Sequence, residues 1–308
     1  WASLRLSTVG VQNTAIGSHS MYNNTTGQYN VALGYQSLYT NTTGSQLTAV
    51  GYQALYSANG TLYNVAIGYR SMYSTTTGDY NTAVGYQSLY NNTTGASNVS
   101  FGYSSLYNNT FGIYNTAFGT STLYTNTTGK NNVAIGYAAL YAADGTQSNV
   151  AIGYQTMRNN SNGDGNTAVG HQSLYSNTTA TYNTAVGYNA LYSNISGVNN
   201  VALGVTALQN NITGSFNVAV GYAAMLNTTY SLYNVAMGYM TMRQNTTGDS
   251  NIAVGYQSLY SNTTGTGNIA IGRGALYSNT YGISNVAVGS VDLNFNGPLG
   301  SNTTGNYN

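Results

Sequence analysis

The sequence contains no cysteine and no glutamate, only one lysine (Lys130) and one proline, and just 4% of its 308 residues are charged. Without cysteine, no disulfide can cross-link the fold. The net charge is +1 and no basic cluster is present, which excludes the charge pattern of a nucleic-acid-binding protein. The chain also lacks a run of 18 apolar residues, so we expect no membrane-spanning segment.

A strict 17-residue period dominates what is present. Sixteen complete units fill residues 13–284, and residues 1–12 fit the same pattern as a partial unit. The consensus is N-[VT]-A-[IVL]-G-Y-Q-[SA]-[LM]-Y-[SN]-N-T-T-G-x-x, whose positions are numbered 1 to 17 below. A short period without insertions predicts an all-β solenoid in which each unit is one coil stacked on the next. We therefore predict a single continuous rod and not the two domains that the length alone suggests.

The pattern within each unit predicts the path of the coil. Alternation around N-V-A-I-G and Y-Q-S-L-Y predicts two short strands, with the glycine at position 5 bending the chain between them. N-T-T-G supplies the second turn. Position 4 is apolar and position 9 is Leu or Met in every copy, so we expect these two positions to form the core, with position 2 partly buried. The asparagine at position 1 predicts a ladder of amides between coils. The predicted fold is thus a parallel β-solenoid, or β-roll.

The coils resemble one another most at a spacing of five, which indicates duplication of an 85-residue block. The coils that begin at Asn81, Asn166 and Asn251 are nearly identical, and each preceding coil carries one arginine and an aspartate at position 16. Because the two charges recur together, we expect ion pairs within a coil or between neighbouring chains. The residues concerned are Arg70, Asp79, Arg158, Asp164, Arg243 and Asp249.

Tyrosine is concentrated at two positions of the coil. It occupies position 6 in eleven copies and position 10 in twelve, which predicts two tyrosine ladders separated by a shallow groove of Ser and Ala at position 8. These ladders either stack on themselves and become buried in an oligomer, or form a stripe that binds sugars or another surface. The candidate binding tyrosines are Tyr35, Tyr39, Tyr52, Tyr56, Tyr86, Tyr90, Tyr256 and Tyr260.

The N-T-T-G turn is also an N-x-[ST] sequon in many coils. Two interpretations are open: the motif is simply favourable turn chemistry, or it carries a row of N-linked glycans along one edge. The candidate acceptors are Asn24, Asn41, Asn92, Asn126, Asn177, Asn194, Asn211, Asn245, Asn262 and Asn302.

Catalytic and metal-binding patterns are missing from the repeat. His19 and His171 are nine coils apart, so they cannot form a dyad or share a metal ion. No carboxylate pair, nucleophile–base spacing or calcium-binding G-G-x-G-x-D repeat is found. We predict that the protein is not an enzyme and uses no cofactor.

The repeat is interrupted at both ends of the chain. The sequence opens at Trp1 in the middle of a unit without a signal peptide, so it looks like a mature or trimmed fragment. Residues 285–308 form a seventeenth unit with a six-residue insertion at Asn294–Leu299 that contains Pro298, and Asn308 stands at position 1 of a further unit. Solenoids normally end in a polar cap, so we predict one segment of a longer filament whose ends meet continuing chain or another copy.

The unit resembles the N-[ST]-x-A-I-G head repeats of YadA-type trimeric autotransporter adhesins. It is still more similar to the N-T-A-V-G-Y-Q-A-L-Y-S-N-T-T-G repeats of bacterial surface proteins and phage tail fibres, as Asn183–Gly197 (NTAVGYNALYSNISG) illustrates. The resemblance extends over essentially the whole chain. It implies a left-handed parallel β-roll, commonly a homotrimer, that serves as a stalk or an adhesive head.

Together these features predict a structural and adhesive segment of an extracellular fibre, at a cell surface or in a virion. The expected partners are other copies of the chain, side by side (a trimer among the options) and end to end, together with carbohydrate or a cell surface. The alternative is a ligand-binding module that uses the tyrosines for carbohydrate or, as a lesser option, the threonine pair at positions 13 and 14 for ice.

Overall fold

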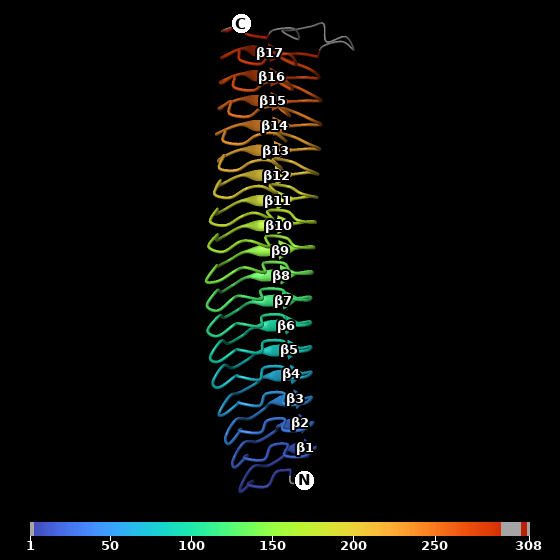
Figure 1. Cartoon of the computed structure of the whole chain (residues 1–308), viewed down its shortest axis with the longest axis vertical. Coiled ribbons are helices and arrows are strands. Elements are labelled where there is room, and N and C mark those ends of the chain that lie inside the picture. Colours follow the sequence, from blue (N-terminus) through green and yellow to red (C-terminus); the bar gives the residue numbers. More distant parts are fainter. Residues whose placement is uncertain (1–2, 291–302, 307–308) are drawn as a thin grey trace. The chain divides into compact units, whose positions relative to one another are not determined.

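A computed structural model describes residues 3–290 and 303–306 of the chain. It divides into two compact units, Trp1–Ile152 and Gly153–Asn308. The division falls inside the coil that begins at Asn149, so it does not follow a change in the repeat. Each unit is a parallel β-solenoid of stacked 17-residue coils, and no helix is present among the described residues, which confirms the predicted fold class (Figure 1).

Each coil contains one three-residue strand, formed by positions 2 to 4. The strands of the first unit are β1 (Thr14–Ile16), β2 (Val31–Leu33), β3 (Thr48–Val50), β4 (Val65–Ile67), β5 (Thr82–Val84), β6 (Val99–Phe101), β7 (Thr116–Phe118), β8 (Val133–Ile135) and β9 (Val150–Ile152). They pair in parallel and in chain order.

The second unit repeats this arrangement. Its strands are β10 (Thr167–Val169), β11 (Thr184–Val186), β12 (Val201–Leu203), β13 (Val218–Val220), β14 (Val235–Met237), β15 (Ile252–Val254), β16 (Ile269–Ile271) and β17 (Val286–Val288). They also pair in parallel in chain order. The register places each residue beside the residue 17 positions later, so chemically equivalent side chains form rows along each unit.

The predicted second strand, Y-Q-S-L-Y, is wrong. Positions 6 to 10 form a series of turns, in which the residues at positions 7 and 9 have positive φ. In the coil of β2, Gln36 has φ of 52° and Leu38 has φ of 51°. This left-handed conformation costs a non-glycine residue about 1–2 kcal/mol, but it turns the Leu38 side chain into the core, and the Leu38 N–H donates to the Ala54 carbonyl oxygen at 3.1 Å.

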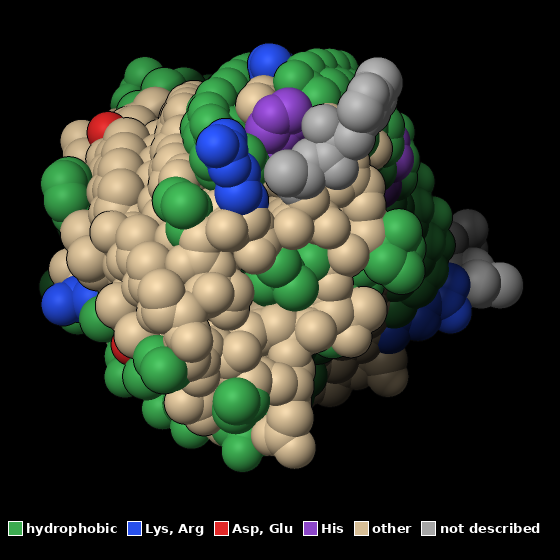
Figure 2. Space-filling model, turned by 90° about the horizontal axis from the view of Figure 1, so that it is seen from below, with side chains coloured by type: hydrophobic (Ala, Val, Ile, Leu, Met, Phe, Trp, Pro, Cys, Tyr) green, Lys and Arg blue, Asp and Glu red, His purple; other side chains and the backbone are tan. Residues whose placement is uncertain are grey.

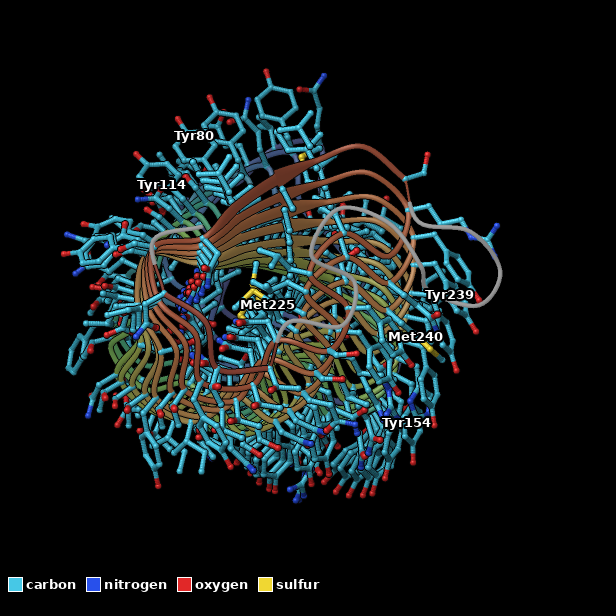
Figure 3. All side chains as sticks on the ribbon, turned by 90° about the horizontal axis from the view of Figure 1, so that it is seen from above. Tyr80, Tyr114, Tyr154, Met225, Tyr239 and Met240 are labelled. Atoms are coloured by element: carbon cyan, nitrogen blue, oxygen red, sulfur yellow. The ribbon has the colours of Figure 1, made fainter. Side chains whose placement is uncertain are left out.

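The apolar core of each coil is formed by the side chains at positions 3 and 9, which face each other. Leu or Met at position 9 is completely buried in each of the sixteen complete coils, as predicted; Figure 3 shows Met225 inside the coil. The prediction for position 4 is wrong, because Ile16 is 59% exposed and Leu33 is 44% exposed. Ala32, at position 3 of the same strand as Leu33, is the residue that is buried. Successive strand residues point to opposite faces, and the narrow coil has room for only a methyl group opposite the position 9 side chain.

The glycine at position 5 forms the bend, as predicted. Gly51 has φ of 134°, a conformation that L side chains rarely adopt, and a Cβ atom there would clash with the carbonyl group of Gly68 in the next coil. The close approach of successive coils therefore requires glycine at this position.

Two rows of buried asparagines connect the coils. The predicted row at position 1 is confirmed: the Asn98 backbone N–H donates to Asn81 Oδ1 at 3.0 Å, and Asn98 Nδ2 donates to the Gly112 carbonyl oxygen at 2.8 Å. A second row, at position 12, was not predicted. There Asn109 Nδ2 donates to Asn92 Oδ1 at 2.8 Å and to the Gly112 carbonyl oxygen at 3.1 Å.

The five-coil period is also visible in the structure. Isolated β-bridges at position 16 join Ser45 to Leu62, Lys130 to Gln147 and Ser215 to Leu232, and these three bridges are 85 residues apart. Each leads into a coil whose turn has no asparagine at position 12.

The expected insertion, including Pro298, lies outside the described residues, as do Trp1 and Asn308. After the insertion, residues 303–306 resume the repeat and form hydrogen bonds with the coil that begins at Asn268 and with Asn285. The Thr280 N–H donates to the Thr303 carbonyl oxygen at 3.0 Å, and Asn285 Nδ2 donates to the Gly305 carbonyl oxygen at 2.7 Å. Thr280 and Thr303 are 23 residues apart, one period plus the six inserted residues.

Candidate functional site

The two predicted tyrosine ladders are formed. In the first unit, eight position 10 rings from Tyr22 to Tyr141 stack without a break, with centroids 5.0–5.6 Å apart and planes within 20° of parallel. Five position 6 rings from Tyr35 to Tyr103 stack at 4.9–5.3 Å. The candidate residues Tyr35, Tyr52, Tyr86 and Tyr256 lie in the position 6 rows, and Tyr39, Tyr56, Tyr90 and Tyr260 lie in the position 10 rows.

The second unit has shorter stacks. At position 6, His171 stacks between Tyr154 and Tyr188 with 5.0 Å between centroids on each side. Tyr239 stacks between Tyr222 and Tyr256 in the same way, at 5.2 and 5.3 Å. In Figure 3, Tyr154 and Tyr239 point outward from the coil with their hydroxyl groups at the periphery.

A third aromatic row lies at position 17 and was not predicted. Tyr63 stacks on Tyr80 with 4.9 Å between centroids, and Phe216 stacks on Tyr233 at 5.1 Å. Tyr80 and Tyr114 point outward in Figure 3. Aromatic residues occupy this position in fewer than half of the coils, so the period alone does not predict a row there.

The stacking limits how the tyrosines can bind a ligand. Each ring face within a ladder is covered by the ring of the next coil, so the faces are not free to pack on a sugar ring. The ring edges and hydroxyl groups remain available, since Tyr35 and Tyr52 are still about two-fifths exposed. The predicted groove at position 8 is wrong, because Ser37 and Ala54 are fully buried inside the coil.

Position 7 lies between the two ladders. The Arg70 guanidinium carbon is 5.3 Å from the centroid of Tyr69 and 5.8 Å from that of Tyr52, both in the position 6 row. It is also 5.4 Å from the centroid of Tyr73 in the position 10 row, and Arg70 Nε donates to Gln53 Oε1 at 2.9 Å. We define the tyrosine face as positions 6, 7 and 10.

Burial changes the acidity of some tyrosines within the ladders. Partial desolvation raises the pKa of Tyr56, and the neighbouring phenols Tyr73, Tyr39 and Tyr35 raise it further. The same two causes, desolvation first, raise the pKa of Tyr107. The ladder therefore resists the loss of a phenolic proton at these positions.

The contacts that the structure gives for Arg70, Asp79, Arg243 and Asp249 are with other groups, and ion pairs between neighbouring chains stay a prediction. The Leu62 N–H donates to Asp79 Oδ1 at 2.8 Å, and the Leu232 N–H donates to Asp249 Oδ1 at 2.7 Å. Arg70 contacts tyrosine rings, and Arg243 Nη1 donates to the Tyr260 hydroxyl at 3.3 Å. Positions 7 and 10 lie on the tyrosine face, whereas position 16 follows the second turn. Asp164 and Arg158 occupy the corresponding positions of their coil.

The candidate glycosylation sites are inaccessible in the folded chain. All nine described acceptors (Asn24, Asn41, Asn92, Asn126, Asn177, Asn194, Asn211, Asn245 and Asn262) are fully buried at position 12, and Asn302 lies outside the described residues. The nitrogen that would carry a glycan is the one that donates the ladder hydrogen bonds, as in Asn177 Nδ2 to Asn160 Oδ1 at 2.7 Å. Glycans would therefore prevent the observed packing, and the structure favours the turn interpretation.

The threonine pair does not form a regular array of free hydroxyls. At position 13, Thr25 Oγ1 donates to the Thr42 carbonyl oxygen at 3.0 Å, and Thr93 Oγ1 donates to the Thr110 carbonyl oxygen at 3.0 Å. Only position 14 faces water freely, and it carries Phe111, Tyr230 or Tyr281 in some coils. These observations weaken the ice-binding alternative.

The outer face of the strands forms an apolar stripe, which we define as positions 2 and 4. Its more exposed large side chains are Ile16, Val31, Leu33, Ile67, Phe118 and Ile135 in the first unit, and Val186, Leu203, Met237, Ile252, Ile271, Val286 and Val288 in the second. Phe101 and Phe118 stack within it at 4.6 Å. Each coil thus adds an apolar side chain at position 4 to this face, and eleven of the seventeen strands add a second at position 2, where the other six carry threonine.

Among residues 3–290 and 303–306, no enclosed pocket is present and no group of three or more metal-binding side chains comes together. No helix in this part of the chain is long and apolar enough to cross a membrane. A scan against models of known protein families finds no match, and a search of curated proteins finds no significant match. The open faces of the coils are thus the surfaces on which a partner could bind.

Proposed function

We propose that the chain is a structural and adhesive segment of an extracellular fibre, at a cell surface or in a virion, with no catalytic role. Copies associate side by side through the apolar stripe and end to end into a filament. The observation that carries this proposal is the exposure of positions 2 and 4 along the strands of both units. A soluble monomer seldom exposes a continuous apolar patch of more than a few hundred Å².

A second copy of the chain is the partner that best fits the stripe. It offers the same row of Val, Ile and Leu at the same 17-residue period, so each coil meets one coil of the neighbour. Transfer of this surface from water is favourable by roughly 25 cal/mol per Å² of apolar area. The stripe carries no charged residue, so no charge has to be desolvated. A closed cyclic assembly such as a trimer would cover the stripe of every copy.

The oligomeric state tests this proposal. Leu33, Ile67 and Ile135 are replaced together by threonine, whose β-branched shape suits a strand but which carries a hydroxyl group. Light scattering after size exclusion should give the wild type a multiple of the 32.4 kDa chain mass, and the variant should shift toward one chain. Circular dichroism should show that the coils remain folded.

A matched control removes apolar surface elsewhere. Tyr63, Tyr80 and Tyr114 at position 17 are exposed but lie outside the stripe, so their replacement by threonine should leave the assembly unchanged. A monomeric wild type, or a stripe variant that assembles as well as the wild type, would contradict the proposal.

A further inference from the structure

The arginines and the aspartates lie at different positions of the coil, whereas the one lysine, Lys130, shares position 16 with three of the aspartates. The five arginines occupy only positions 6, 7 and 10: Arg5, Arg70, Arg158, Arg243 and Arg273. The aspartates of the described residues occupy only positions 13 and 16: Asp79, Asp144, Asp164 and Asp249. Both histidines also lie on the tyrosine face. Seen from the N-terminal end, Figure 2 shows purple histidine beside blue basic side chains at its top, and both red acidic and blue basic side chains at its left. In each unit the arginines therefore gather on the tyrosine face, and Lys130 is the one basic side chain that lies outside it.

Three arginines of this face contact tyrosine rings, which leave their charge available. Arg5 contacts the Tyr22 ring and donates to its hydroxyl, and Arg70 lies among three tyrosine rings. In the second unit, the Arg273 guanidinium carbon is 5.8 Å from the Tyr256 centroid. A cation over a ring is stabilised by the ring quadrupole without being neutralised. Contacts of this kind also restrict the side chain, so less entropy is lost when it binds an anion.

The tyrosines add regularly spaced hydroxyl groups. Ring centroids within the position 10 ladder are mostly 5.0–5.3 Å apart, so the hydroxyls that they carry follow one another at a similar interval. Each phenol both donates and accepts a hydrogen bond. This interval is comparable to the length of one sugar unit in an extended polysaccharide, whose hydroxyl and acidic groups recur in the same way.

We infer that the tyrosine face binds a linear acidic polysaccharide, which lies along the coils and is bound by ring edges, phenol hydroxyls and arginines. This inference rests on the proposed adhesive role and names the class of its target. A nucleic acid fits less well, because its charge density demands many more cations and its bases need free aromatic faces for stacking. A neutral glycan would make no use of the arginines.

Binding of polymers to the full chain tests the inference. Immobilised protein is exposed to polygalacturonate and hyaluronate, with unmodified dextran and single-stranded DNA of similar length as comparisons. We expect both acidic polysaccharides to bind, with affinity falling as salt rises because dissolved ions screen the attraction between the arginines and the acidic groups. Equal binding of neutral dextran would overturn the inference, and tighter binding of the DNA would favour nucleic acid as the partner and overturn it as well.

Charge variants locate the site. Replacement of Arg70, Arg243 and Arg273 by glutamine should weaken polygalacturonate binding about tenfold or more and flatten its salt dependence. The matched control is Asp79→Asn, which changes the charge away from the tyrosine face and keeps the acceptor for the Leu62 N–H; its binding should not weaken. Unchanged binding by the triple variant would overturn the inference.

The fibre proposal and the polysaccharide inference can be rejected independently of each other. The oligomeric state is measured on the same samples, and the threonine variant of the apolar stripe should dissociate while each chain still binds the polysaccharide. An assembly that responds to the stripe but ignores all acidic polysaccharides would support the fibre and reject this target.

Discussion

At the scale of single residues, the position 12 asparagine shows how a turn residue becomes part of the core. Its amide occupies the space above position 15, where a Cβ on Gly112 would clash with Asn109 Oδ1. In the two coils that have Ala58 or Ala143 at position 12 in place of asparagine, position 15 is Thr61 or Thr146 in place of glycine. The two positions thus change together because they share one volume. Two coils are exceptions that nothing in the structure explains: one keeps Asn177 with Ala180 at position 15, and the other has Thr75 with Gly78.

Replacement of one ladder asparagine should show the value of these bonds. Asn109→Asp removes both donated hydrogen bonds and places a carboxylate beside Asn92 Oδ1 and the Gly112 carbonyl oxygen. Because the site is fully buried, we expect the free energy of unfolding to fall by about 3 kcal/mol or more. Urea denaturation measures this change.

The adjacent residue provides the control. Asn108 is only half-buried, and its Oδ1 accepts a hydrogen bond from Asn91 Nδ2 at 3.0 Å. An aspartate keeps that acceptor, so Asn108→Asp should cost less than about 1 kcal/mol. Equal losses in both variants would mean that position 12 is not buried as described.

The tyrosine ladders predict a loss of stability in alkali. Desolvation and neighbouring phenols raise the pKa of Tyr56, Tyr107 and Tyr277 above the ordinary value of 10.0. The unfolded chain therefore ionises first, so their contribution is complete below pH 10.0 and is lost as pH rises through the folded pKa values. Melting temperature should fall above that pH, and less steeply when the three residues are replaced by phenylalanine. Parallel pH profiles for the two proteins would contradict this expectation.

At the scale of the coil, the bend glycine fixes how closely neighbours approach. Gly85 has φ of 135°, and a Cβ there would clash with the Gly102 carbonyl oxygen. Gly85→Ala should therefore cost about 3 kcal/mol or more, because strain and a backbone clash act together. Gly60 has φ of 79°, and a Cβ atom added there would have its nearest neighbour at 3.4 Å, an ordinary contact distance. Gly60→Ala should therefore cost only the backbone strain, about 1 kcal/mol. Chemical denaturation compares the two variants, and similar losses would show that contact between coils does not select glycine.

The coil also shows which features could be predicted from the sequence. Gly51, Asn98 and Leu38 have roles that follow from residue type and period, and each was predicted. The strand phase was not, because Ala32 and Leu33 are both apolar and nothing local shows which faces inward. The turn through Gln36 and Leu38 was predicted as a strand, because positive φ at such residues is imposed by packing between coils and leaves no mark in composition.

The same limit applies to the candidate surfaces. The tyrosine rows follow from the period alone, since Tyr35 and Tyr52 are equivalent residues of successive coils. Their ring orientation depends on the distance between coils and could not be predicted. Asn24 and Asn41 form a sequon whether exposed or buried, so only the structure distinguishes a glycan acceptor from a core amide.

At the scale of the whole molecule, each coil within a unit bonds only to its immediate neighbours. The Leu89 N–H donates to the Ser105 carbonyl oxygen in the next coil at 2.9 Å, and β5 pairs with β4 and β6, the strands of the two adjacent coils. Stability is then a sum of coil terms and interface terms between neighbours. Damage to one coil should therefore have an effect that depends on its place in the unit.

Two equivalent substitutions test this dependence. Leu89→Asp and Met21→Asp each place a charge at a fully buried position 9, one in the middle of the first unit and one near its first coil. Leu89→Asp should remove bonds on both sides, so amide hydrogen exchange should increase in the coils before and after it. Met21→Asp should increase exchange only in the first coils, because those that follow keep all their other neighbours. Mass spectrometry of peptic fragments measures both patterns, and uniform loss of protection throughout the unit in both variants would show that its coils unfold as one cooperative body.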